Sequence, residues 1–482
     1  MSTTSTVLAI DLGAESGRLV AAQLHGERIA LDVAQRFANR PVQVRDTLHW
    51  DVLRLWSEIQ DGIAACADRK PTALGVDTWG VDFALLDRQG HLLGNPVHYR
   101  DARTEGMLEK AFARVPRPEI FRATGIQFIP INSLYQLVSM VESDHPALRE
   151  ASTFLTIPDL LNFWLTGEKA GEFTSATTTQ CYNPRTGDWA KDILALLEIP
   201  VEMFPAIAQP GTRLGTFRGI PVMLPACHDT GSAVAAVPTK TKRFAYLSSG
   251  TWSLLGLEVP QAILSDEALA ANLTNEGGVC GTFRLLKNIM GLWLIQQCRA
   301  TWAAQGKSYE YHVLAEMARS APSFAVFVDP DDNAFLSPGD MPARIAAFCQ
   351  RTGQTPPEGV SAVTRCVFES LALKYRIVLD TLLDVSGQDV DVLHVIGGGS
   401  QNELLCQMTA NAINRPVIAG PAEATALGNA LMQWLGLGEI ASIDDARTVV
   451  RQSVELKTYE PMEVGRWEEA IGRFKSVLAR TV

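Results

Sequence analysis

The stretch that decides the fold is residues 7–22, VLAIDLGAESGRLVAA. Residues 7–10 form a continuous apolar run, which predicts a buried strand, and residues 19–22 predict a second strand that returns beside it. The turn between them, residues 13–18, consists mostly of small residues. Such a turn exposes backbone N–H groups and a serine hydroxyl, which suits a phosphate chain. The alternative is a hairpin turn whose glycines serve only positive φ angles.

The second half of the chain opens in the same way. Residues 244–257, FAYLSSGTWSLLGL, predict a strand, a turn of small residues and a returning strand. We interpret the two openings as an ancient duplication, with two hairpins that grip one phosphate chain across a cleft. The polar, basic stretch 238–242 separates the halves, so we expect an N-terminal domain over 1–240 and a C-terminal domain over 241–482.

Length and composition also favour two domains and exclude several classes of protein. A chain of 482 residues is too long for one core. Its net charge of −11 disfavours a nucleic-acid or anionic-membrane surface. No apolar run approaches the length of a membrane span, and the first residues lack the pattern of a signal peptide. We therefore expect a cytoplasmic protein without nucleic-acid or membrane partners, of an oligomeric state that the sequence does not give.

The eight cysteines are scattered, and no two have the spacing C-x-x-C. Without paired cysteines or histidines, a zinc site is not expected. In a large chain without a signal peptide, such cysteines are typically reduced and buried.

Residues 228–233, HDTGSA, carry the predicted chemistry. They follow an apolar run over 221–226 that predicts a buried strand. An aspartate at the exit of a buried strand requires partners or a role, and Asp229 is flanked by His228 and Thr230, which can bind a hydroxylated ligand. Such an aspartate can take a proton from a substrate hydroxyl during phosphoryl transfer. The alternative is that Asp229 only caps the following helix.

Other polar or glycine-rich segments are expected to lie near this site or at the surface. Residues 77–83 form a second polar cluster at a strand end, and residues 175–180 predict a loop near the cleft. Residues 99–104 carry a run of charges, which favours a solvated position for Arg103. Residues 397–399, GGG, end a strand and would let a flat ring lie against the backbone, or simply form a tight turn.

Five ordered segments of this sequence resemble the FGGY family of carbohydrate kinases: residues 10–13, 228–230, 249–251, 397–399 and 423–430. The resemblance extends over nearly the whole chain. It implies an α/β fold of two ribonuclease-H-like domains, as in actin-type ATPases, around a central cleft. The N-terminal domain would bind sugar and phosphate, and the C-terminal domain would bind nucleotide.

The resemblance also implies the cosubstrate ATP and roles for individual residues. Asp229 would be the proton acceptor. The sugar would contact Gly80, His228, Thr230 and Asn288. The nucleotide would contact Ala14, Glu15, Ser16, Gly17, Arg18, Thr251, Gln296 and Gly398. Glu15 departs from this pattern, because a carboxylate repels phosphates unless a cation or Arg18 intervenes. At the end of the first strand, Asp11 is suited to hold Mg²⁺ through water.

Four segments are most similar to the members of the family that act on L-rhamnulose: residues 77–83, 228–234, 246–253 and 287–293. They imply transfer of the ATP γ-phosphoryl group to the 1-hydroxyl of L-rhamnulose. Another deoxy-ketose such as L-fuculose remains an alternative, because no single side chain decides the stereochemistry of the sugar. A second alternative is a non-catalytic sugar or nucleotide sensor. A sensor needs no base at the sugar hydroxyl, so the presence of Asp229 favours the kinase.

Overall fold

The computed structural model describes residues 4–480, which form two compact units. Unit 1 comprises residues 4–238, 258–285 and 424–453. Unit 2 comprises residues 239–257, 286–423 and 454–480. The predicted limits, 1–240 and 241–482, differ from these units because two segments of the second half pack with the first half. Local sequence patterns carry no sign of this exchange.

Unit 1 is built on a sheet with the strand order β13-β14-β6-β1-β2-β3. β1 pairs antiparallel with β2 and parallel with β6, and β6 pairs parallel with β14. The strands are β1 (Ser5–Leu12), β2 (Ser16–His25), β3 (Arg28–Ala38), β6 (Ala73–Thr78), β13 (Arg213–Phe217) and β14 (Ile220–Met223). The structure therefore confirms the predicted hairpin over residues 7–22.

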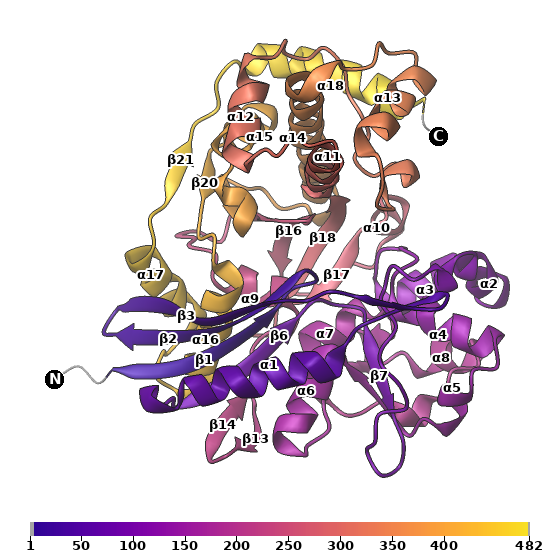
Figure 1. The fold of residues 1–482 in the computed structure, drawn as a ribbon, viewed down its shortest axis with the longest axis vertical. Coiled ribbons are helices and arrows are strands. Elements are labelled where there is room, and N and C mark those ends of the chain that lie inside the picture. The colour runs from indigo at the N-terminus through magenta and orange to yellow at the C-terminus, as the bar shows by residue number, and fades with distance from the viewer. Residues whose placement is uncertain (1–3, 481–482) are drawn as a thin grey trace. The chain divides into compact units, whose positions relative to one another are not determined.

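Both faces of β1 are buried because its side chains alternate between two cores. Leu8, Ile10 and Leu12 belong to a large cluster with apolar residues of α1 (Val52–Ala65) and α6 (Ile157–Thr166). Ala9 instead packs with Ala426 of α16 (Ala424–Leu437), on the other face. Figure 1 shows α1 running across the sheet of unit 1. When both faces of a strand are buried, all its side chains tend to be apolar, which explains the continuous apolar sequence of residues 7–10.

Unit 2 repeats this topology. The sheet of the second half has the strand order β17-β18-β16-β15-β19-β20-β21, of which residues 258–259, 274–277 and 283–285 are counted with unit 1. β15 pairs antiparallel with β16 and parallel with β19, and β19 pairs parallel with β20. These pairings match those of β1 with β2, β1 with β6 and β6 with β14. The strands are β15 (Phe244–Ser249), β16 (Trp252–Val259), β18 (Phe283–Met290), β19 (Val392–Ile396), β20 (Val417–Ala419) and β21 (Lys457–Tyr459). The predicted duplication therefore has a structural counterpart.

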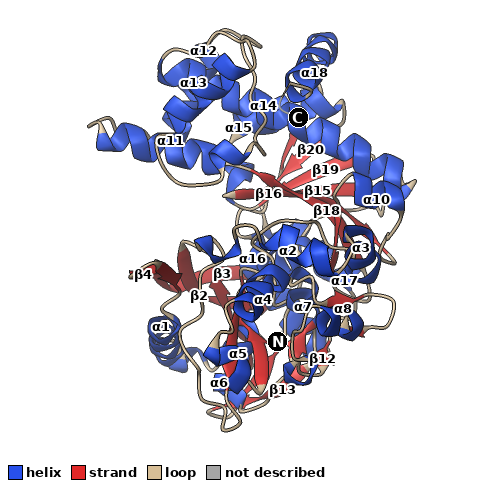
Figure 2. Ribbon diagram, turned by 90° about the vertical axis from the view of Figure 1, so that its right-hand side faces the viewer, coloured by secondary structure: helices blue, strands red, loops and turns tan. Residues whose placement is uncertain are grey.

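Helices flank the strands in both units (Figure 2). The other helices and strands of unit 1 are β4 (Val42–Val44), β5 (Thr47–His49), β7 (Phe83–Leu86), α2 (Met107–Arg114), α3 (Arg117–Thr124), α4 (Ser133–Glu142), α5 (Pro146–Glu150), β8 (Thr153–Thr156), β9 (Gly171–Glu172), α7 (Phe173–Thr178), β10 (Tyr182–Asn183), β11 (Asp188–Trp189), α8 (Lys191–Leu196), β12 (Ile207–Ala208), α9 (Asp229–Ala235), α10 (Asp266–Ala270), β17 (Thr274–Gly277) and α17 (Ile443–Ser453). The helices of unit 2 are α11 (Trp293–Ala304), α12 (Tyr311–Ser320), α13 (Met341–Arg351), α14 (Gly359–Ser386), α15 (Glu403–Ile413) and α18 (Val464–Leu478).

The cysteines are mostly buried, as the sequence predicts. All eight are unpaired, and only Cys280 is exposed. Across residues 4–480, no helix combines the length and the apolar character that a membrane crossing needs.

Candidate active site

Aspartates from neighbouring elements gather at one edge of the sheet in unit 1. Asp11 of β1 and Asp77 of β6 are partners in the parallel ladder. Asp229 begins α9, and His228 before it forms a parallel bridge with Thr78. The carboxyl ends of parallel strands meet at the same edge, where open α/β sheets bind their ligands. The structure therefore brings the predicted base, Asp229, to the edge that carries Asp11.

Burial and mutual repulsion perturb these carboxylates. Burial raises the pKa of Asp77 well above its ordinary value, and the charge of Asp11 raises it further. Asn429 of α16 opposes this shift by donating from Nδ2 to Asp77 Oδ2 at 2.6 Å. The other oxygen, Oδ1, is buried and has no hydrogen-bond partner among the described residues. Asp77 lies in the polar cluster over residues 77–83, but the sequence assigned no role to this residue.

Asp229 has partners on one oxygen and an open side. Its Oδ1 accepts hydrogen bonds from the backbone nitrogen of Thr230 at 2.5 Å and from Thr230 Oγ1 at 3.1 Å. His228 Nε2 lies 3.4 Å from the same oxygen. Burial raises the pKa of Asp229, and nearby His228 partly offsets that rise. Because 30 % of its side chain stays accessible, the carboxylate can reach a ligand.

The opposite side of the His228 ring contacts two buried charges that the sequence did not single out. Nδ1 lies 3.1 Å from Nη2 of Arg284 and 3.3 Å from Oε2 of Glu276. Arg284 is fully buried, and its Nη2 also lies 3.1 Å from Glu276 Oε2. Nothing in the local pattern around Glu276 or Arg284 identified them, since each lies in a strand of ordinary appearance.

The backbone that carries His228 is held by α7. Glu172 Oε2 accepts hydrogen bonds from Thr174 Oγ1 at 2.6 Å and from the backbone nitrogen of Cys227 at 3.1 Å. Thr174 Oγ1 then accepts from the backbone nitrogen of His228 at 3.0 Å. The loop predicted over 175–180 was wrong up to residue 178, because threonine hydroxyls there bond to carbonyls within the helix, as Thr177 does to Thr174.

Gly80 lies in a constrained loop after β6. An added Cβ at Gly80 would lie 3.1 Å from Thr178 Oγ1, and the next residue, Val81, has φ of +66°. A β-branched residue in this region is strained and must be held by its surroundings. The backbone nitrogen of Val81 donates to Thr178 Oγ1 at 3.1 Å. The predicted sugar contact thus belongs to a loop with little freedom to move.

The residue after Val81, Asp82, anchors the same loop through its buried carboxylate. Its Oδ2 accepts hydrogen bonds from the indole nitrogens of Trp50 at 2.5 Å and Trp79 at 2.9 Å. Burial raises the pKa of Asp82 to about 6. The prediction of a solvated Arg103 was wrong, since its Nε is buried and its Nη2 donates to Gln136 at 2.6 Å. Gln136 also donates to Asp82, so a charge run in the sequence here forms part of a buried network.

The predicted phosphate hairpin has an open tip and a packed base. Glu15 and Ser16 are exposed, Ala14 is half-buried, and Gly17 is buried. An added Cβ at Gly17 would lie 2.3 Å from Phe37, so packing alone explains this glycine. Arg18 lies opposite Asp11 in the β1–β2 ladder, and its Nε and Nη2 donate to Asp11 Oδ2 at 2.8 and 2.7 Å. Arg18 therefore compensates the charge of Asp11.

Unit 2 holds three of the predicted nucleotide contacts, and two of them touch each other. Gln296 of α11 donates from Nε2 to Thr251 Oγ1 at 3.1 Å, at the turn between β15 and β16. An added Cβ at Gly399 would lie 2.0 Å from Ser249 Oγ, whereas one at Gly398 would meet nothing within 4 Å. The backbone of Gly398 is therefore open on the side where a Cβ would lie, whereas that of Gly399 is packed against Ser249. An open backbone of this kind suits contact with a flat ring.

Asn288, the remaining predicted sugar contact, is half-buried in β18. The backbone nitrogen of Met290, two residues on, donates to Asp331 Oδ1 at 2.9 Å, and Lys374 lies 2.9 Å from the other oxygen of Asp331. This end of β18 is therefore fixed by a partly buried ion pair.

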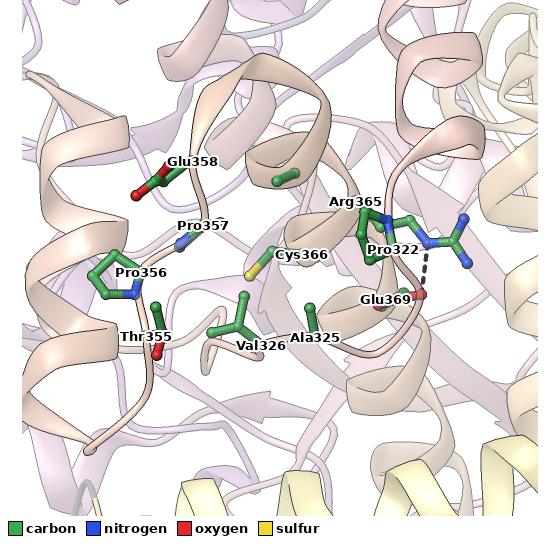
Figure 3. Close-up of a pocket in the computed structure, with 11 residues that line it drawn as sticks. Pro322, Ala325, Val326, Thr355, Pro356, Pro357, Glu358, Arg365, Cys366 and Glu369 are labelled. Atoms are coloured by element: carbon green, nitrogen blue, oxygen red, sulfur yellow. Dashed lines mark hydrogen bonds and ion pairs between the residues drawn. The ribbon is translucent and has the colours of Figure 1, made fainter.

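A cavity of about 350 Å³ lies elsewhere in unit 2 (Figure 3). Its walls include Pro322, Pro356 and Pro357, and Arg365 bonds to Glu369 at 2.6 Å beside them. No residue that the sequence predicts for the site lines this cavity.

Solved structures with this fold include sugar kinases. The chain is similar to a ligand-bound xylulose kinase from Lactobacillus acidophilus, with a TM-score of 0.82, 16% identity and 98% of each chain covered. It is also similar to Plasmodium falciparum glycerol kinase with ADP, with a TM-score of 0.79, 17% identity, and coverage of 99% of this chain and 98% of that one. The fold is that of the carbohydrate kinases, which confirms the predicted fold class.

The profile of the FGGY family of carbohydrate kinases matches the chain in two parts. Its N-terminal domain matches residues 6–220, and its C-terminal domain matches residues 245–437. The chain belongs to this family, and it is an enzyme of the phosphotransferase class. It is 42% identical to a rhamnulokinase of Bacteroides thetaiotaomicron over 97% of this chain and 98% of the relative. It is 41% identical to a rhamnulokinase of Oceanobacillus iheyensis over 94% of this chain and 97% of that relative.

Proposed function

We propose that the chain transfers the γ-phosphoryl group of ATP to the 1-hydroxyl of L-rhamnulose. The observation that carries the proposal is Asp229, a carboxylate with a raised pKa and an accessible side, at the sheet edge of unit 1 that also carries Asp11. The names of the relatives support the choice of sugar. The four sequence segments most similar to kinases of L-rhamnulose, which include residues 228–234, support it as well.

In this proposal Asp229 orients the 1-hydroxyl and accepts its proton as the phosphoryl group is transferred. A raised pKa makes a carboxylate a stronger base, so burial helps this role while the accessible side admits the substrate. Gly80, His228, Thr230 and Asn288 bind the sugar. Ala14 and Glu15 of the turn, residues 16–18 at the start of β2, and Thr251, Gln296 and Gly398 of unit 2 bind nucleotide.

The residues around Asp11 also fit Mg²⁺. Mg²⁺ keeps several of its waters and needs only one or two carboxylates from a protein. The buried Oδ1 of Asp77 without a partner and the mutual repulsion of the aspartates favour a nearby cation. Asp11 would hold Mg²⁺, which supplies positive charge to the phosphates. Arg18, already paired with Asp11, would add further positive charge at the same place.

We keep two further expectations as part of the proposal: the enzyme works in the cytoplasm, and it binds a small-molecule sugar but no nucleic acid or membrane. L-Fuculose remains the alternative substrate. It differs from L-rhamnulose only in stereochemistry, which no single side chain here decides.

A coupled assay of ADP release over a panel of sugars tests the proposal. The panel contains L-rhamnulose, L-fuculose, D-xylulose and glycerol, each with ATP and Mg²⁺. We expect kcat/KM for L-rhamnulose to exceed that for each other sugar by about tenfold or more. A preference for L-fuculose would replace the substrate but keep the reaction. No sugar-dependent ADP release at all would favour the non-catalytic sensor.

A further inference from the structure

The imidazole of His228 lies between a guanidinium and the proposed base. On one side Arg284 Nη2 makes a hydrogen bond of 3.1 Å with Nδ1. On the other side Nε2 lies 3.4 Å from Asp229 Oδ1. All three residues belong to unit 1, and the ring and the guanidinium are both buried.

The contact with Arg284 fixes where the ring carries its hydrogen. A guanidinium has five N–H donors, no acceptor, and does not lose its proton in proteins. Glu276 Oε2 also lies 3.3 Å from Nδ1, but the hydrogen bond of Nδ1 is the one with Arg284, so Nδ1 must be the acceptor and must carry no hydrogen. The hydrogen of the neutral ring then lies on Nε2, which faces Asp229.

Glu276 stabilises the buried charge of Arg284 in this arrangement. Arg284 has no exposed surface, and a buried charge without a counter-charge is strongly destabilising. Glu276 Oε2 lies 3.1 Å from Arg284 Nη2, and the backbone carbonyl of Gly277 accepts from Arg284 Nε at 2.8 Å. The contact of Nη2 with Glu276 Oε2 is an ion pair, and the hydrogen bond of Nη2 is the one with His228 Nδ1.

We propose that Arg284 is a positioning residue that holds His228 in the tautomer with hydrogen on Nε2, so that the ring donates to a sugar oxygen beside the reacting hydroxyl. This inference rests on the proposed function. It assigns the two neighbouring side chains separate tasks: Asp229 accepts a proton, and His228 only donates a hydrogen bond. It also states what the ligand must offer. The carbon next to the one that bears the phosphorylated hydroxyl must have an oxygen that can accept a hydrogen bond. A ketose that reacts at its 1-hydroxyl has such an oxygen at C2.

The tautomer can be measured without any activity. The chain has eight histidines, so ¹⁵N-labelled histidine gives a spectrum in which His228 is assigned by comparison with His228→Gln. At a pH of about 8, above the ordinary pKa of imidazole, we expect His228 to carry its hydrogen on Nε2 alone. A ring with hydrogen on Nδ1 in the parent protein would overturn the proposal, whatever reaction the protein catalyses.

A paired variant then tests the effect on the sugar. Arg284→Met with Glu276→Gln removes the donor and its counter-charge together, which avoids an unpaired buried charge. We expect the single tautomer to be lost, the sugar KM to rise about tenfold, and kcat to change by less than about threefold. Arg284→Lys keeps a charged donor and should restore both the tautomer and most of the sugar affinity. If the paired variant does not fold, the ¹⁵N spectrum of the parent protein decides the proposal by itself.

Unit 1 offers a matched control. Arg447 is also buried, and its Nη2 lies 2.8 Å from both oxygens of Glu258. Arg447→Met with Glu258→Gln removes an equivalent ion pair from the same unit. It should lower stability to a similar degree but leave the His228 tautomer and the sugar KM unchanged. If this control shifts the sugar KM as much as the Arg284 variant does, the rise in KM comes from a general loss of stability in unit 1. The proposal then fails.

Discussion

Asn429 and Asp77 are joined by a hydrogen bond of 2.6 Å, although 352 residues separate them in the sequence. Asn429 Oδ1 in turn accepts from Gln433 Nε2, which also donates to the carbonyl of Leu8 in β1. One face of α16 thus bonds to the backbone and the carboxylate at the centre of the sheet in unit 1. The position of the aspartate edge depends on a helix near the end of the chain.

Replacing Asn429 by Ala should therefore destabilise unit 1. The change leaves Asp77 Oδ2 buried without its donor, which costs about 1 to 3 kcal/mol of unfolding free energy. Denaturant unfolding followed by circular dichroism measures the loss. Asn95→Ala at an exposed position is the control and should change stability by less than about 0.5 kcal/mol. Equal stability of the two variants would contradict a supporting role for Asn429.

Asp229→Asn tests the proposed base. The amide keeps the size of the side chain but cannot accept the substrate proton, so kcat should fall by about 10² to 10⁴. Sugar binding should survive, because His228, Thr230 and Asn288 are unchanged, and calorimetric titration with the sugar measures it. A helix cap would instead cost about 1 kcal/mol of stability and leave turnover intact. A folded variant that turns over at the parent rate would refute the role of Asp229.

Gly398→Ala separates a nucleotide contact from a packing requirement. An added Cβ there meets nothing within 4 Å, so the thermal midpoint should stay the same. The methyl group would occupy the space proposed for the nucleotide ring, so the KM for ATP should rise about tenfold. Gly399→Ala is the contrast, because its Cβ would overlap Ser249 and should lower the thermal midpoint. An unchanged KM for ATP in Gly398→Ala would remove Gly398 from the nucleotide site.

The contact between α16 and α9 gives a prediction on packing. A Cβ at Gly428 would lie 1.7 Å from the carbonyl oxygen of Ser232, so Gly428→Ala forces two helix backbones apart. We expect a loss of about 3 kcal/mol or more in unfolding free energy. Gly472→Ala is the matched control, since this exposed glycine in α18 has open space around it. That variant should gain up to about 1 kcal/mol from helix propensity.

Two buried carboxyls predict the pH dependence of stability. Burial raises the pKa of Asp159 to about 8 and that of Glu172 to about 7. The folded chain therefore binds protons more tightly than the unfolded chain, so their contribution is full below about pH 4 and is lost as the pH rises through about 7 to 8. Urea midpoints between about pH 5 and 8 should fall with rising pH. Asp159→Asn should flatten this slope, and an unchanged slope would show that Asp159 does not titrate in this range.

Sequence patterns predicted the elements whose signal is local. The hairpin over residues 7–22 follows from two apolar runs and the small turn residues between them. The candidate base Asp229 could be found because it directly follows a predicted strand. The helix over 173–178 was missed because its threonines resemble a loop, although their hydroxyls are satisfied within the helix.

Buried charges left no comparable local signal. Arg284 contacts His228 across 56 residues, and neither residue has a periodic pattern that points to the other. Arg103 belongs to a charge run that is typical of a surface, and only the fold shows its guanidinium donating to Gln136. The same holds for the division into units, since the apolar face of α16 does not show which sheet it covers.

The interleaved composition of unit 1 has a consequence for biosynthesis. When the first 238 residues have left the ribosome, the face of β1 and β2 that includes Ala9 and Val20 still lacks its cover, because Ala426 has not yet been translated. The nascent chain must therefore keep this apolar surface exposed while nearly two hundred further residues emerge. Co-translational folding of unit 1 is completed only at the end of synthesis, and a chaperone that shields bare sheets would act in that interval.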